Sequence, residues 1–202
     1  RKGGLIASRD VRIGNIVLKA TPLPAPDKSK LIKAISEAIK KEGEQLMNFD
    51  KEVIQWQNRV LSLRKWRPQE QWPDVSNYSL LINNDKWLSP YLQHVKKPED
   101  LKKINLKDVL HHHLSWEKQQ KLNHLAPERI EMPTGSRIKL EYFPNGQPPV
   151  LAVRLQEVFG LATTPLINEG QTRVLMHLLS PGFKPVQVTS DLESFWTSAY
   201  YE

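Results

Sequence analysis

Cysteine is absent from the 202 residues. The chain therefore forms no disulfide and offers no Cys-ligated zinc site. No apolar run approaches the roughly 20 residues that a membrane-spanning helix needs, and no signal peptide is visible. We expect no membrane span.

Sequence motifs for nucleotide binding or hydrolysis are also missing. Thr134-Gly135-Ser136-Arg137 looks like part of a phosphate-binding loop. A Walker A loop, however, needs a second Gly, a Lys-Ser/Thr pair and a following helix, whereas an alternating, strand-like segment follows here. We interpret Pro133–Ser136 as a hairpin turn, and no Gly-x-Ser-x-Gly elbow is present. No catalytic residue is predicted, and we expect the chain to be non-catalytic alone.

The three consecutive histidines His111, His112 and His113 suggest a metal site at first sight. Neighbouring helical side chains point about 100° apart, so three in a row cannot converge on one ion. No metal ligand and no bound cofactor are predicted.

Aromatic and basic residues, by contrast, are plentiful. Six Trp, five Tyr and five Phe indicate packed cores. The net charge of +7 and pI of about 9.5 favour an acidic partner such as nucleic acid. Residues 126–202 hold 6 basic and 8 acidic side chains, which leaves 23 basic and 14 acidic among residues 1–125. The net positive charge of the chain therefore lies in residues 1–125.

The pattern predicts an α+β fold that begins with a β-hairpin in residues 1–26. Leu5-Ile6-Ala7 and Ile16-Val17-Leu18 are its short apolar runs, and the Pro-rich segment 22–27 is a stiff connector.

Residues 27–125 are predicted to be helical. Asp27 is a good N-cap for a helix that continues to Gly43. Further helices are predicted over 50–66, over 77–92, from Pro98, over 106–114, and from a Ser115 cap up to Pro127.

Residues 126–202 are predicted to form a small β-β-α-β-β-α domain. Strands near 130–132 and 137–142 precede a helix over 150–160, then a hairpin turns at Pro181-Gly182. Ser190 with Glu193 is a capping box for the last helix. The alternation places Ile138, Leu140 and Tyr142 in a core with Val153, Phe159 and Leu178, and Arg137, Lys139 and Glu141 outside.

A mixture of cations and tryptophans in residues 58–73 suits phosphate contacts and base stacking. The alternative is that Trp56 and Trp66 fill a core while the cations are merely solvated. Arg137 and Lys139, which face outward on their predicted strand, are weaker candidates for phosphate contacts. The predicted nucleic-acid-binding residues are Arg59, Arg64, Lys65, Trp66, Arg67, Arg137 and Lys139.

Several phrases together resemble the C-terminal region of bacterial HrpB-type ATP-dependent helicases of the DExH-box superfamily. They are "QWPDVSNYSLLINNDKWLSPYL", "HLAPERIEMPTGSRIKLEYF", "PPVLAVRLQEVFGLATTP" and "HLLSPGFKPVQVTSDLESFW". The opening, up to "IGNIVLKATPLPAP", resembles the end of that family's OB-like segment.

The resemblance implies a piece of a cytoplasmic RNA helicase, which agrees with a start at "RKGG" and an end at "TSAYYE". Two motor lobes upstream would carry the phosphate loop and the DExH box, and would bind ATP and Mg. The partners implied are these motor lobes and single-stranded RNA or DNA, which the chain would guide. The alternative is a protein-docking module that recruits the helicase to a partner.

Overall fold

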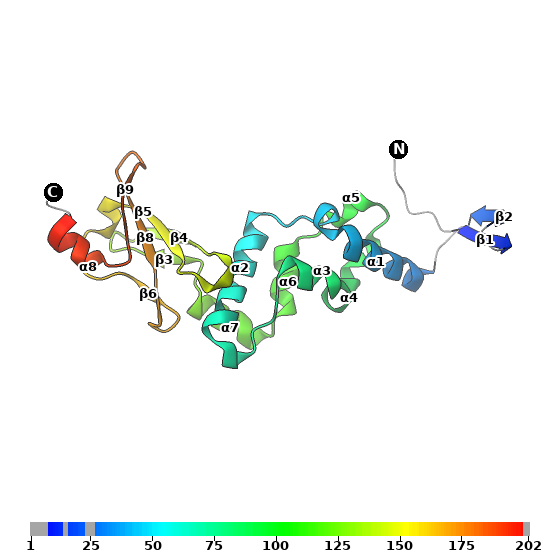
Figure 1. Ribbon diagram of the computed structural model, residues 1–202, viewed down its shortest axis with the longest axis horizontal. Coiled ribbons are helices and arrows are strands. Elements are labelled where there is room, and N and C mark those ends of the chain that lie inside the picture. The colour runs from blue at the N-terminus through cyan, green and yellow to red at the C-terminus, as the bar shows by residue number, and fades with distance from the viewer. Residues whose placement is uncertain (1–7, 14–15, 23–26, 200–202) are drawn as a thin grey trace. The chain divides into compact units, whose positions relative to one another are not determined.

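The computed structural model describes residues 8–13, 16–22 and 27–199. The fold is α+β, and the chain separates into two compact units. The first comprises residues 1–50 with 76–113, and the second comprises residues 51–75 with 114–202. We call them the helical unit and the sheet unit (Figure 1).

The chain enters the helical unit through the predicted hairpin. Strand β1 (Ser8–Ile13) pairs antiparallel with β2 (Ile16–Pro22), and a bulge interrupts the register between Val11 and Arg12. The Leu5-Ile6-Ala7 run and connector residues 23–26 lie outside the described residues.

Helix α1 (Lys28–Leu46) begins as predicted, because the Asp27 carboxylate accepts the Ser29 N–H at 2.9 Å. It buries Ile35 and Ile39 and continues one turn beyond the predicted end at Gly43. The other helical segments of this unit are α3 (Asn77–Ile82), α4 (Asn84–Trp87), the 3-10 segment η2 (Ser89–His94), α5 (Pro98–Leu101) and α6 (Leu106–His113).

The single helix predicted over 77–92 is wrong, since the chain breaks it twice. Asn84 directs its side-chain amide to the Leu81 and Ser36 carbonyls, at 2.7 and 3.1 Å. Such a bond competes with the helical backbone pattern. Pro90 has no N–H to donate and stands at the second position of the tighter 3-10 segment.

The sheet unit combines two long helical segments with a five-stranded sheet. Helix α2 (Lys51–Trp66) is followed by the 3-10 turn η1 (Pro68–Glu70), and α7 (Trp116–Leu125) starts at the predicted Ser115 cap. The sheet order is β3-β4-β5-β8-β9, with only β5 and β8 parallel. The strands are β3 (Arg129–Glu131), β4 (Arg137–Glu141), β5 (Val150–Arg154), β8 (Leu175–Leu179) and β9 (Pro185–Thr189), beside the separate pair β6 (Leu166–Ile167) and β7 (Thr172–Arg173).

The helix predicted over 150–160 is wrong. Residues 150–154 form β5, the central strand, and Leu155–Val158 form the 3-10 turn η4. Val150, Leu151 and Val153 are buried, and β5 pairs with β4 on one side and β8 on the other. Pairing on both sides satisfies the strand backbone, so this context overrides a helical pattern.

The chain end also differs in detail. The Asp191 carboxylate, not Ser190, accepts the Ser194 N–H and caps α8 (Leu192–Ser194). The Ser190 backbone carbonyl accepts the Thr164 hydroxyl at 3.0 Å. A π-type turn, η5 (Phe195–Ala199), follows α8.

The predicted core alternation largely holds in β4. Leu140, Tyr142, Val153 and Leu178 are buried, and Arg137 and Glu141 are exposed. Ile138 and Lys139 are half-buried. Phe159 is 47% exposed, so its predicted place in the core is wrong. It follows η4 instead of closing a helix, and its ring lies 6.0 Å from that of Trp196.

The compact units do not follow the three consecutive segments 1–26, 27–125 and 126–202. Helix α2 groups with the sheet because the Gln55 and Asn58 side-chain amides donate to the Tyr142 carbonyl, at 3.1 and 2.8 Å. The Gln55 side-chain oxygen also accepts the Tyr142 N–H at 2.8 Å.

Candidate nucleic-acid interface

Arg59, the first predicted phosphate contact, lies inside the sheet unit and is 3% exposed. Its guanidinium donates to the Ala126 carbonyl at 2.6 Å, to Asn123 Oδ1 at 3.0 Å and to Glu128 at 3.0 Å. Burial lowers the pKa of this guanidinium, and the Glu128 carboxylate opposes that shift. Arg59 joins α2 to the end of α7 and is not at the surface where a nucleic acid could contact it.

Arg67 is also occupied by partners within the sheet unit. It donates to Glu70 at 2.7 Å, to the Asn168 side-chain oxygen and to the Glu169 carboxylate. The bond from Arg67 is the main reason that the pKa of Glu70 is lowered. Arg67 therefore holds the turn after β6 in place.

The two strand cations differ from each other. Lys139 pairs with Glu52 at the start of α2. Arg137 is exposed on the neighbouring stretch of β4 and remains available to solvent. The Lys139 ammonium is therefore engaged by a carboxylate, whereas the Arg137 side chain faces solvent.

Arg64, Lys65 and Trp66, at the C-terminal end of α2, remain the strongest part of the prediction. Arg64 and Lys65 are exposed, and Trp66 is half-buried. The Trp66 indole N–H donates to the Gly146 carbonyl at 2.8 Å, which fixes the ring against the 144–146 loop. Gly146 also lies against the Lys65 side chain, because a Cβ placed there would come within 2.8 Å of Lys65 Cβ.

Helix α7 adds two residues that the sequence prediction missed. Lys118 Nζ donates to the Gln71 carbonyl at 2.6 Å, and Arg64 donates to the next carbonyl, that of Trp72, at 2.9 Å. Trp116, in the same first turn of α7, is 74% exposed. A Trp-x-Lys pattern directly after a Ser cap is the signal that could have pointed to them. Trp72 itself is buried and unavailable for stacking.

We call Arg64, Lys65, Trp66 and Lys118 the basic surface. Its three cations and one indole come from two different helices, and Arg64, Trp66 and Lys118 each donate to a backbone carbonyl of the same unit. Cations arranged in this way attract phosphate groups, and a half-exposed indole offers a face on which a base can stack. The arrangement contains no nucleophile–base pair and suits binding instead of reaction chemistry.

Comparison with known proteins shows the origin of the chain. Residues 87–202 match the family described as ATP-dependent helicase C-terminal, HrpB_C. The chain belongs to this family. Residues 1–23 match the connector region of the ATP-dependent RNA helicase HrpB.

Relatives of known sequence and structure agree with this family membership. The chain is 38% identical over 201 residues to the ATP-dependent RNA helicase HrpB of Escherichia coli K12, covering all of this chain and 25% of that protein. The crystal structure of the E. coli DExH-box NTPase HrpB matches 96% of this chain and 24% of its own, with a TM-score of 0.84 and 38% identity. A second crystal structure, of the E. coli DEAH/RHA helicase HrpB, matches with a TM-score of 0.80 and 37% identity. The chain therefore spans about a quarter of the length of the relatives it matches.

The described residues were also compared with the requirements of a metal site and of a membrane-spanning helix. No group of three or more His, Cys, Asp or Glu side chains is placed to hold a metal ion there, and His112 Nδ1 lies 2.6 Å from the Asp108 carbonyl. None of the helices in that part of the chain is long and apolar enough to cross a membrane.

Proposed function

We propose that this chain is an accessory C-terminal part of a cytoplasmic ATP-dependent RNA helicase, and that it guides single-stranded nucleic acid near the motor. Membership of the HrpB C-terminal family supports the context. ATP and Mg would bind in the motor lobes of the whole protein. The observation that carries the guiding role is the basic surface, where Arg64, Lys65 and Lys118 accompany the fixed Trp66 indole.

The basic surface fits a single strand better than a duplex. Its aromatic component can stack only on a base that is free of its pairing partner, and its cations can follow a flexible backbone. Phosphate contacts carry no sequence information, so this surface would hold any strand that leaves the motor.

Replacing Arg64, Lys65 and Lys118 together by Ala tests the proposal. Affinity for a fluorescent oligouridine should fall, and the slope of log K against log salt should flatten by about 0.7 for each phosphate that is no longer neutralised. Fluorescence anisotropy at several salt concentrations measures both quantities.

The matched control replaces Lys28, Lys30 and Lys33 of α1 by Ala. These three lysines are exposed, and their removal changes the net charge by the same amount. If the two triple variants lose affinity equally, binding reflects net charge alone, and the basic surface is not the site.

A further inference from the structure

The hairpin that joins β8 to β9 has an aromatic residue where glycine is usual. Phe183 has φ +61°. Its N–H donates to the Ser180 carbonyl at 2.9 Å, and the Ser180 N–H donates to the Lys184 carbonyl at 2.8 Å, which closes a three-residue loop. In such loops glycine normally occupies the left-handed position. Here Gly182 stands one residue earlier, and its φ lies outside the left-handed region.

No core contact explains this strained position. A bulky side chain at positive φ is rare and costs stability, and strain of this kind is concentrated at functional sites. The Phe183 side chain is 68% exposed, so burial of its ring does not compensate for the strain. The backbone therefore presents an aromatic ring to solvent at the tip of the hairpin.

Arg154, at the end of β5, lies beside this ring. Its guanidinium carbon is 5.5 Å from the centre of the Phe183 ring, which is within the range of a cation–π contact. Arg154 donates to Glu157 at 2.8 Å, and the Thr134 hydroxyl donates to the same carboxyl group, so the guanidinium is held in place. The Arg154 side chain is 42% exposed and that of Glu157 only 12%, so the cation faces solvent more than its carboxylate does.

The charge beside the ring is positive. Residues 180–189 contain one charged side chain, that of Lys184, which is exposed. With Arg154 it places two cations next to an exposed aromatic ring. Aromatic side chains stack on unpaired bases and neighbouring cations attract phosphates, a combination typical of contacts to single-stranded nucleic acid.

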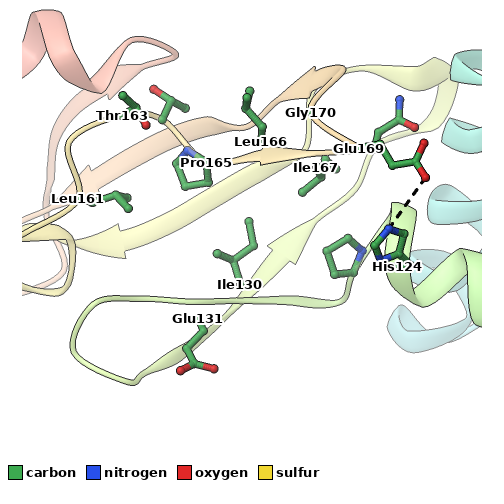
Figure 2. A pocket seen from close by; sticks show the side chains of 13 residues that line it. His124, Ile130, Glu131, Leu161, Thr163, Pro165, Leu166, Ile167, Glu169 and Gly170 are labelled. Carbon is green, nitrogen blue, oxygen red and sulfur yellow. Dashed lines mark ion pairs between the residues drawn. The ribbon is translucent and has the colours of Figure 1, made fainter.

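The groove between β3 and β6 provides a contrast within the same unit. Leu166, which is 53% exposed, lines it together with Ile130 (Figure 2). Among the described residues that line this groove, none is Lys or Arg, and the His124 ring nitrogen lies 4.0 Å from the Glu169 carboxylate. An exposed apolar side chain in this groove therefore lacks the cations that accompany Phe183.

We infer that the tip of the β8–β9 hairpin is a second contact for single-stranded nucleic acid, in which Phe183 stacks on a base and Arg154 and Lys184 contact the adjacent phosphates. The inference rests on the proposed function for the class of ligand, but it uses no residue of the basic surface. Because the turn fixes the ring before a strand arrives, the entropy cost of stacking is lowered.

Replacement of Phe183 in the 202-residue chain tests the stacking contact. Phe183→Ala should weaken binding of the fluorescent oligouridine about tenfold, because one stacked base is lost. Phe183→Trp should retain the affinity, whereas Phe183→Leu should lose it as Ala does, since an aliphatic side chain has no ring to stack. Leu166→Ala is the matched control, which removes an exposed apolar side chain without neighbouring cations and should leave the affinity unchanged. Fluorescence anisotropy measures all four variants.

Phe183→Gly separates loss of the ring from damage to the turn. Glycine adopts a positive φ without strain, so this variant should melt about 2–4 °C above Phe183→Ala. It should nevertheless bind oligouridine as weakly as Phe183→Ala does. Affinity that is retained in Phe183→Gly and lost in Phe183→Ala would show that binding depends on the shape of the turn, and would overturn the inference.

Two further results would overturn it. Unchanged affinity in Phe183→Ala would leave the ring to a protein partner, and full affinity in Phe183→Leu would mean an apolar contact without stacking. The triple variant of Arg64, Lys65 and Lys118 tests the basic surface separately. If only Phe183→Ala weakens binding, the hairpin contact stands and the basic surface is not the site, whereas the reverse result removes the hairpin contact alone.

Discussion

Arg59 carries its charge into the interior of the sheet unit. Its hydrogen bonds satisfy carbonyl oxygens at the end of α7, where a helix leaves its last carbonyls without partners. The same guanidinium pairs with Glu128, whose side chain is 46% exposed. A residue that looks like a phosphate contact in the sequence is thus a structural link between distant segments.

Arg59→Ala should therefore lower the free energy of unfolding by about 3 kcal/mol, since it leaves buried carbonyl groups unsatisfied and opens a cavity. Arg64→Ala, five residues along the same helix but exposed, should change it by less than about 0.5 kcal/mol. Urea denaturation of both variants measures the difference. Equal, small effects would mean that Arg59 is not held as described.

At the scale of single elements, the loop 144–146 positions the end of α2. Gly146 has φ +72°, and an added Cβ would lie 2.8 Å from Lys65 Cβ and 3.2 Å from the Trp66 indole nitrogen. Glycine is required there both for its left-handed backbone and for its lack of a side chain.

Gly135 separates these two effects, because it has φ +84° but nothing within 4 Å of an added Cβ. Gly135→Ala should cost about 1–2 kcal/mol from backbone strain alone. Gly146→Ala should cost about 1–3 kcal/mol more, from overlap with α2, and should alter tryptophan fluorescence. Thermal melts of the two variants give the comparison, and identical costs would argue against close packing of the loop on α2.

Local signals explain which elements the sequence could predict. The Asp27 and Ser115 caps and the alternation of Ile138, Leu140 and Tyr142 depend on residues only a few positions apart. The segment 150–154 carries an apolar run that suits a buried helix or a central strand equally, and only pairing with β4 and β8 decides.

The candidate site also combines features that depend on neighbouring residues with features that depend on distant ones. Arg64, Lys65 and Trp66 stay a prediction, which the sequence suggests because these residues are adjacent and lie at one helix end. The burial of Arg59 depends on a carbonyl 67 residues away, and the contribution of Lys118 depends on a second helix. The burial of Arg59 has no local pattern, and the Trp-x-Lys pattern after Ser115 points to Lys118 without revealing its partner. The burial and the partners of these cations therefore could not be predicted from the sequence.

At the scale of the whole molecule, the sheet unit is built from two separate parts of the chain. Residues 51–75 and 114–202 fold together, and residues 76–113 belong to the helical unit. Lys118 donates to the Gln71 carbonyl at 2.6 Å. The chain therefore leaves the sheet unit before residue 76 and returns to it after residue 113 at neighbouring places. Helix α2 also supplies the buried Trp56, Val60 and Leu63.

A shortened chain of residues 51–202, with 76–113 replaced by a flexible Gly-Ser linker of about eight residues, should therefore fold cooperatively. Residues 126–202 alone should not, because they lack α2, the Arg59 link and the bonds from Gln55 and Asn58 to Tyr142. Circular dichroism melts and the dispersion of amide resonances distinguish a packed domain from a collapsed chain. A cooperative melt of residues 126–202 alone would show that the sheet does not need α2 and that the boundary drawn from the sequence marks an independent domain.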